Sequence, residues 1–306
     1  MRPKLGRADI GRYADRFDVP AATGGLGVTF LGVTTLLFDD GESAVLTDGF
    51  FSRPPLLQVG FRRLAPNQAR IEAALLRAGI ESLEVVAPVH THFDHALDAP
   101  VVAARTGAVL AGGTSAANLG RGYGLAEDRL LIVTPGDPAR FGTFRLTWVV
   151  SEHCPPDRYP GTITEPVIPP ARARAYRCGE AWSILVEHDS GRTALVQGSA
   201  GFVPGVLAGH QAQVAYLGIG QLGLQSEDYI RTYWAETVEA VGARRAVLTH
   251  WDDFFRPLDE PLRALPYAGD DLDATMRVLS AVAEEQGVLL QFPNAWRRED
   301  PWRSLG

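Results

Sequence analysis

The chain has 306 residues, of which 46% are hydrophobic and 21% charged, and its formal net charge is −7 at pH 7. This balance is typical of a globular protein, and the negative charge disfavours nucleic-acid or anionic-membrane surfaces, which need a dense basic face. No run of 18 apolar residues predicts a membrane span, and no apolar signal core follows the basic start. We therefore expect a cytoplasmic protein without stable membrane insertion that acts on a small molecule, and its composition leaves a homo-oligomer open.

Residues 1–26 are polar and mixed in charge, and we expect them to form an N-terminal arm. One domain is expected over 27–306. β-Branched and aromatic residues predict a strand over 27–38 and a second over 43–47, joined as a hairpin by the turn at residues 39–42. Similar patterns predict the later strands at 83–89, 108–111, 130–133, 144–150, 182–187, 193–197, 213–219, 245–249 and 288–292.

Apolar residues at helical spacing predict helices over 66–78, 97–105, 226–241 and 271–286. The segment 154–178 is too long and too rich in proline for a plain connection, so we expect an ordered loop over the functional site. Cys154 and Cys178 are expected to be free thiols. Hairpins in each half, with helices between them, indicate an α/β protein with two facing sheets covered by helices.

The clearest motif is His90-Thr91-His92-Phe93-Asp94-His95, which follows the apolar strand predicted at 83–89. Side chains two apart on extended chain point the same way, so His90 and His92 can reach one ion together. The turn that follows aims Asp94 and His95 elsewhere. Three imidazoles and a carboxylate this close repel one another when the imidazoles are protonated, and a shared cation removes this repulsion most easily. The spacing therefore predicts a metal site with two halves.

Other polar residues also follow predicted strands. His153, Ser199 and His250 each come directly after the end of an apolar strand, as His90 does. Ligand groups in layered α/β proteins gather at this edge of a sheet. We therefore expect these four strand ends to meet at one rim.

The histidine string, an isolated strand-end histidine, a Gly-x-x-Gly turn at 198–201 and a final strand-end histidine together resemble the metallo-β-lactamase superfamily over residues 27–292. Within it, residues 27–49, the turn at Gly198 and the strand before His250 look most like the branch that includes L-ascorbate 6-phosphate lactonase and phospholipase-D-like hydrolases of N-acyl ethanolamine lipids. The resemblance implies the metallo-β-lactamase fold, an αββα sandwich of two mixed β-sheets flanked by helices, with a metal site at one edge.

The resemblance also implies the ligand sets. His90, His92 and His153 would hold one ion, and Asp94, His95 and His250 a second. Each set offers three N or O ligands and leaves a position for water, as a catalytic site requires. Asp48, at the end of the strand predicted over 43–47, matches a family carboxylate that supports the ligand histidines from behind.

One position departs from the family pattern. Where the family has an aspartate that bridges both ions, this chain has Ser199. Loss of that charge raises the repulsion between two dications, so three arrangements stay open. They are a single ion on the first set, two ions joined only by hydroxide, and a substitute carboxylate supplied by Asp252, Asp253 or Glu152.

These features predict a metal-dependent hydrolase in which a metal-bound hydroxide attacks an ester, lactone or phosphodiester bond of a small molecule. Asp94 would orient the nucleophile or pass its proton to the leaving group. We expect one or two Zn²⁺ ions, with Mn²⁺ or iron as alternatives. The competing readings are an iron-dependent redox enzyme with a similar ligand set and a catalytically inactive ligand-binding protein.

Aromatic residues flank the predicted site. Phe50 and Phe51 follow Asp48, and Trp251, Phe254 and Phe255 follow His250. These rings would either form an aromatic wall of the cleft or pack in the core.

Overall fold

The computed structural model describes residues 4–305 and, within them, places two seven-stranded sheets face to face. The first sheet runs in the order β16-β1-β2-β3-β5-β6-β7. Its strands are β1 (Gly27–Phe30), β2 (Leu36–Asp39), β3 (Ala44–Thr47), β5 (Val85–Ala87), β6 (Val109–Gly112), β7 (Leu130–Ile132) and β16 (Arg298–Glu299). Its first four strands pair antiparallel and the remaining pairs are parallel.

The second sheet runs in the order β15-β14-β13-β12-β11-β9-β8 and is also mixed. Its strands are β8 (Pro138–Phe141), β9 (Phe144–Ser151), β11 (Ala181–His188), β12 (Thr193–Gln197), β13 (Val214–Gly218), β14 (Arg245–Thr249) and β15 (Leu289–Gln291). The pairs from β8 to β12 are antiparallel, and those from β12 to β15 are parallel.

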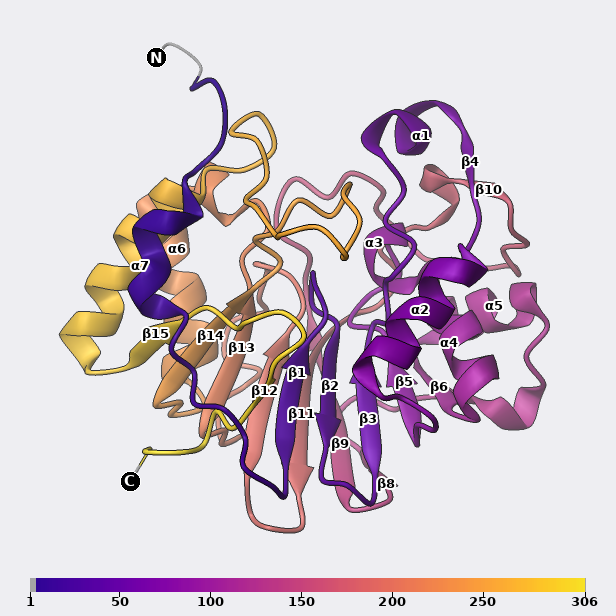
Figure 1. Ribbon diagram of the computed structural model, residues 1–306, viewed down its shortest axis with the longest axis horizontal. Coiled ribbons are helices and arrows are strands. Elements are labelled where there is room, and N and C mark those ends of the chain that lie inside the picture. The colour runs from indigo at the N-terminus through magenta and orange to yellow at the C-terminus, as the bar shows by residue number, and fades with distance from the viewer. Residues whose placement is uncertain (1–3, 306) are drawn as a thin grey trace.

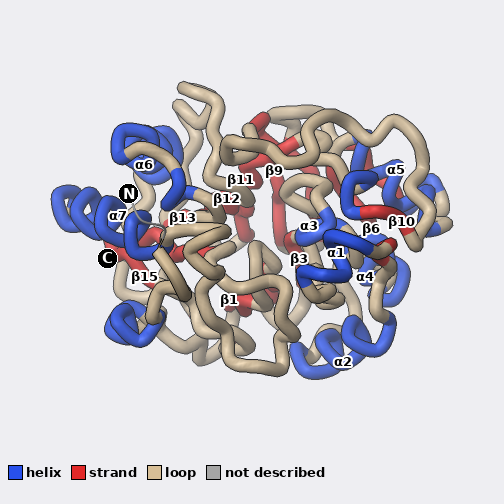
Figure 2. Tube along the Cα trace, turned by 90° about the horizontal axis from the view of Figure 1, so that it is seen from above, coloured by secondary structure: helices blue, strands red, loops and turns tan. Residues whose placement is uncertain are grey.

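Helices cover the outer face of each sheet (Figure 1). Those beside the first sheet are α2 (Gln68–Ala78), α4 (Ala99–Thr106) and α5 (Thr114–Tyr123), and those beside the second are α6 (Glu227–Trp234) and α7 (Leu272–Gln286). Seen from above, the strands lie between the two groups of helices (Figure 2). This is the αββα sandwich that the sequence predicts.

Alternating strand residues build the layers. In β5, Val85 and Ala87 face the core between the sheets, whereas Val86 packs with α2 and α4. In β14, Val247 faces the same central core while Leu248 packs with α6 and α7. Because both faces of these strands are covered, they are apolar throughout, as parallel strands in α/β proteins usually are.

Helices α2 and α7 end at the predicted residues and begin one or two residues after the predicted starts. Asn67 accepts the backbone N–H of Arg70 at the start of α2, and Gly79 ends that helix in the left-handed conformation. Asp271 and Gly287 do the same for α7. Helix α6 continues into a π-helical turn at Ala235–Glu239, so the helix predicted over 226–241 is present with a change of winding.

One strand prediction is wrong. The predicted strand over 27–38 is two strands, β1 and β2, which form a hairpin around Leu31–Thr35. Gly32 (φ 90°) and Val33 (φ 52°) adopt left-handed conformations in this turn. A β-branched residue such as Val33 disfavours positive φ, so the local sequence predicts extended chain there and tertiary contacts override it.

The sequence also gave no signal for β8 or α5. Helix α5 contains Gly120 and Gly122, which lower helix propensity. A Cβ at Gly122 would lie 2.0 Å from the carbonyl oxygen of Val167, so glycine is needed where the proline-rich segment crosses this helix. The close packing thus requires a residue type that lowers helix propensity, so the sequence pattern does not predict this helix.

Short elements complete the fold. The segment Ile10–Arg16 is a 3₁₀ helix in the predicted arm, and further 3₁₀ turns lie at Glu127–Arg129, Ala173–Ala175 and Leu222–Leu224. Helices α1 (Leu56–Phe61) and α3 (Phe93–Ala96) follow β3 and β5 and lie above the first sheet in the view of Figure 1. Strand β10 (Ala171–Arg172), in the proline-rich segment, pairs with β4 (Arg63–Leu64). No helix among residues 4–305 has the length and apolar character needed to cross a bilayer.

Candidate metal centre

The ligand motif follows the end of β5 and turns directly into α3. Trp182 donates its backbone N–H to the carbonyl oxygen of Val89 (2.9 Å), and Thr91 donates its own to that of Cys178 (2.8 Å). These bonds hold the chain on either side of His90 against β11 and the segment just before it. His92 is the first residue before α3, so the helical turn carries Asp94 and His95 to a different side from His90 and His92.

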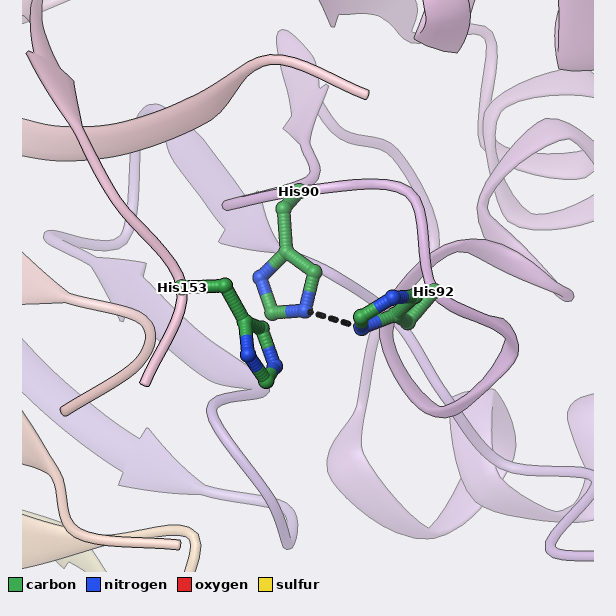
Figure 3. Close-up of side chains that lie close together, drawn as sticks. All are labelled: His90, His92 and His153. Atoms are coloured by element: carbon green, nitrogen blue, oxygen red, sulfur yellow. Dashed lines mark hydrogen bonds between the residues drawn. The ribbon is translucent and has the colours of Figure 1, made fainter. Parts of the chain in front are cut away.

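The first cluster consists of His90, His92 and His153, whose rings point toward one another (Figure 3). One nitrogen from each lies within 4.8 Å of the others, and His90 Nε2 is 3.1 Å from His92 Nδ1. The Nδ1 of His153 lies 2.7 Å from the carbonyl oxygen of Cys154. Because a carbonyl only accepts, that Nδ1 carries the proton and leaves the Nε2 lone pair free for a cation.

The second cluster consists of Asp94, His95 and His250. The Oδ2 of Asp94 lies 3.8 Å from His95 Nε2 and 3.6 Å from His250 Nε2. The His95 Nε2 atom is buried and has no hydrogen-bond partner among residues 4–305. The two clusters adjoin, since the ring centroids of His90 and His95 are 3.9 Å apart.

Charge and burial keep the donors in a state that binds cations. Burial, with the neighbouring imidazoles, holds the pKa of His90 well below its ordinary value and lowers the pKa of His153 to about 4. Burial would raise the pKa of Asp94, but His95 and His250 outweigh it and lower that pKa. At neutral pH, His90 and His153 are therefore neutral and Asp94 is a carboxylate.

Asp94 acts on His250 in return. Burial alone would lower the pKa of His250, but its contact with Asp94 raises that pKa. A proton and a cation would therefore compete for the Asp94–His250 pair.

Asp48 supports His95 from behind. Its Oδ2 atom lies 2.8 Å from His95 Nδ1 and accepts the hydroxyl of Thr34, while Oδ1 accepts the backbone N–H of Val89 (2.9 Å). The carboxylate thus accepts a hydrogen bond from Nδ1–H of His95 and leaves the Nε2 lone pair for the cluster. Thr34 lies in the turn between β1 and β2, and the sequence gave no sign of its part here.

Three residues at this rim have left-handed backbones, although none is glycine. They are Val33 (φ 52°), Asp48 (φ 55°) and His250 (φ 58°), and His250 donates its N–H to the carbonyl oxygen of Val33. Such conformations cost of order 1–3 kcal/mol each and gather at functional sites. Their presence together supports a functional role for this rim.

The glycines at 198 and 201 allow close packing behind the histidines. A Cβ at Gly198 would lie 2.1 Å from Val89, the residue before His90. A Cβ at Gly201 would lie 2.2 Å from the carbonyl oxygen of Glu152, the residue before His153. The turn after β12 therefore needs glycine because it lies against both ligand segments.

Ser199, the expected altered bridging position, lies in this turn and is buried. Its hydroxyl oxygen accepts the backbone N–H of Cys154 (2.9 Å). The serine hydroxyl thus satisfies the backbone N–H of the residue that follows His153.

The three proposed substitute carboxylates point elsewhere. Asp252 pairs with Arg53 and accepts the N–H of Val33, while Asp253 pairs with Arg7 and Arg263. Glu152 is exposed. The carboxylate that does lie near the first cluster is Asp157, whose Oδ1 is 3.2 Å from His92 Nε2. No spacing in the proline-rich segment singled it out.

The aromatic residues divide into two groups. Phe50, Phe51 and Trp251 are buried in apolar clusters. Phe254 is partly exposed, and its ring meets that of His250 edge-on at 5.5 Å and packs against Phe255 at 4.4 Å. An aromatic wall beside the site therefore comes from Phe254 and Phe255. Both Cys154 and Cys178 are free, as predicted, and both are buried.

The two mixed sheets, the covering helices and the histidine-aspartate clusters at one sheet edge define a protein with the metallo-β-lactamase fold. Comparison with solved structures supports this. A metallo-β-lactamase fold protein from Bacillus subtilis is similar over 90% of this chain and 97% of its own, with a TM-score of 0.50 and 12% identity. A metallo hydrolase from the archaeon Ignicoccus hospitalis is similar over 90% of this chain and 96% of its own (TM-score 0.53, 15% identity).

A third similar structure is a diiron β-hydroxylase from Streptomyces venezuelae, with a TM-score of 0.53 and 11% identity. The similarity covers 90% of this chain and 54% of that longer protein. No family model and no curated protein sequence matches this chain. At these identities the comparisons establish the fold.

Proposed function

We propose that this protein is a metal-dependent hydrolase that cleaves an ester, lactone or phosphodiester bond of a small molecule. The observation that carries the proposal is the meeting of two adjoining clusters, each of three imidazole or carboxylate groups, at one rim. The name of the similar metallo hydrolase from Ignicoccus hospitalis supports it.

The residues present fit a cation. The buried Nε2 of His95 has no partner among the described residues, and the Nδ1 protons of His95 and His153 have outward acceptors that leave their Nε2 atoms free. Neutral imidazole and carboxylate donors suit Zn²⁺ and also Mn²⁺ or iron, and we propose zinc. His90, His92 and His153 would hold one ion, and Asp94, His95 and His250 a second. An ion bound there would polarise the bond under attack and lower the pKa of water.

The chain's own residues supply the remaining chemistry. The Asp94 carboxylate, with its lowered pKa, lies where it can orient water or pass a proton to the leaving group. Asp48 and Thr34 fix the ring of His95, which keeps its free nitrogen on the cluster side. Phe254 and Phe255 would contact an apolar part of the substrate. The lactone and phosphodiester classes follow from the lactonase-like and phospholipase-D-like branch that the sequence resembles.

The experiment combines metal analysis with a substrate screen. Protein stripped with a chelator is titrated with Zn²⁺ and tested on ester, lactone, thioester and phosphodiester substrates. His90→Ala should lose both metal and turnover, whereas the control His210→Ala, outside both clusters, should keep them. Wild-type protein that binds less than a tenth of an equivalent of every metal tested would contradict the proposal and favour a non-catalytic ligand-binding protein.

The second candidate is an iron-dependent oxidation, because one similar structure is named a diiron β-hydroxylase and imidazole and carboxylate also bind iron. Elemental analysis and the ultraviolet-visible spectrum of protein purified without added metal decide between the two. Iron with a ferric absorption band would favour the oxidation, and a colourless zinc protein the hydrolase.

We further propose a cytoplasmic protein with a small-molecule substrate and no nucleic-acid partner, in which 27–306 forms one domain. Contacts between the N-terminal arm and this domain support the proposal that the arm belongs to the same folded unit. Arg16 donates to the carbonyl oxygen of Leu290, and Tyr13 to the carboxylate of Asp273.

A further inference from the structure

The two ring nitrogens of His92 face different surroundings. Nδ1 lies 3.1 Å from His90 Nε2, on the side of the first cluster. Nε2 is buried, has no hydrogen-bond partner among residues 4–305 by the usual geometric criteria, and lies 3.2 Å from Asp157 Oδ1. Because the two nitrogens lie on different edges of the ring, a His92 that ligates through Nδ1 presents Nε2–H to Asp157.

Asp157 is held where it can accept this proton. Its Oδ1 also accepts the backbone N–H of Tyr159 (2.9 Å), which fixes the side chain. The carbonyl oxygen of Tyr159 accepts the N–H of Cys178 (2.8 Å), and that of Cys178 accepts the N–H of Thr91 (2.8 Å). Thr91 lies between the two ligand histidines, so backbone hydrogen bonds connect the segment that carries Asp157 to the segment that carries His92.

Two of the other ligand histidines have an acceptor behind the ring. The Nδ1 of His95 faces Asp48, and that of His153 faces the carbonyl oxygen of Cys154. Asp157 occupies the corresponding place behind His92. A carboxylate behind a ligating histidine fixes its tautomer and makes the ring a stronger donor.

We propose that Asp157 is a positioning residue for the first metal ion: its carboxylate accepts the Nε2 proton of His92 and leaves Nδ1 for the cation. The proposal rests on the proposed function. The first cluster consists of three imidazoles, and Asp157 gives it a neighbouring negative charge. This charge matters in a chain that has a neutral serine at 199.

A different use of the same residues would contradict this role. His92, Asp157 and Cys178 could themselves hold a cation, because one ligand atom of each lies within 4.8 Å of the others. His92 would then ligate through Nε2, which would carry no proton for Asp157 to accept. Thiolate ligation gives Co²⁺ an intense near-ultraviolet charge-transfer band, which imidazole ligation lacks.

The test measures Co²⁺ affinity by competition with a chelator in the full chain, using wild type, Asp157→Asn, Asp157→Glu and the exposed control Asp128→Asn. Asp157→Asn should weaken binding about 10–100-fold, as loss of an outer carboxylate typically does. Asp157→Glu should recover most of the affinity, and Asp128→Asn should match wild type. The visible Co²⁺ spectrum should change in Asp157→Asn, while the melting temperature of the metal-free protein should not.

Two results would overturn the role of Asp157 alone. One is unchanged Co²⁺ affinity in Asp157→Asn. The other is a charge-transfer band in wild type that Cys178→Ala removes, which would show thiolate ligation. Wild type that binds no Co²⁺ would refute the proposed function as well, so the two failures are distinguishable.

Discussion

Loss of one member of the buried ion pair between Arg53 and Asp252 should lower the free energy of unfolding considerably. Both side chains are fully buried. Asp252 follows the candidate ligand His250 by two residues and also accepts the backbone N–H of Val33 (2.9 Å). The pair therefore joins the segment after β3 to the segment after β14, on which His250 lies.

The structure sets the size of the effect. The Nε and Nη1 atoms of Arg53 have no hydrogen-bond partner among residues 4–305, so Asp252 is the charge that compensates this guanidinium. Asp252→Asn keeps an oxygen for the N–H of Val33 but leaves the buried cation uncompensated, which typically costs about 3–5 kcal/mol of stability. Arg53→Met in the Asp252→Asn background removes that cation, so the double variant should regain at least about 2 kcal/mol.

The assay is urea unfolding followed by tryptophan fluorescence and circular dichroism, on wild type, Asp252→Asn and the double variant Asp252→Asn/Arg53→Met. We expect Asp252→Asn to unfold at a much lower urea concentration than wild type. The midpoint of the double variant should lie between those two midpoints or above that of wild type. An Asp252→Asn variant within 1 kcal/mol of wild type, or a double variant less stable than Asp252→Asn, would refute this reasoning.

Three further predictions concern the site and its support. Ser199→Asp should raise the metal content measured by elemental analysis toward two equivalents, because it introduces at 199 the carboxylate that the resembled family has at this position; unchanged stoichiometry would mean that this turn is misassigned. Gly201→Ala should cost about 1–3 kcal/mol and weaken metal binding, since its Cβ would meet the carbonyl oxygen before His153, whereas Gly60→Ala, with open space around it, should do neither in the same unfolding and chelator assays. Burial raises the pKa of Asp98 from 3.8 to about 6 despite hydrogen bonds from Ser52. A raised pKa in the folded state gives stability that is present below pH 3.8 and lost as the pH rises through 6, so the stability of wild type relative to Asp98→Asn should fall by up to about 3 kcal/mol between pH 4 and pH 7. A difference that does not change with pH in unfolding experiments would contradict this.

Much of the architecture and of the candidate site could be predicted from the sequence because it depends on local pattern. Strands β12 and β14 lie at the predicted residues, since apolar runs bounded by turn residues need no distant partner to be recognised. The spacing of His90, His92, Asp94 and His95 predicted two diverging pairs, and the structure brings them into two separate clusters. The strand ends that carry His153 and His250 meet at the same rim, as expected for strands in one layered fold.

Only the tertiary structure decided which distant side chains support these groups. Arg53 and Asp252 are 199 residues apart, so no periodic pattern links them. Asp48 was expected from the resemblance to support the ligand histidines, but the structure decided that the histidine it contacts is His95. The left-handed turn at Val33 and the helix containing Gly122 oppose their own local preferences and exist because neighbouring segments hold them. Asp157 lies in a proline-rich segment without periodicity, and only the folding of that segment against Thr91 places its carboxylate beside His92. Local residues thus set the strands and the histidine string, whereas long-range packing set the partners, the tautomers and the charges around them.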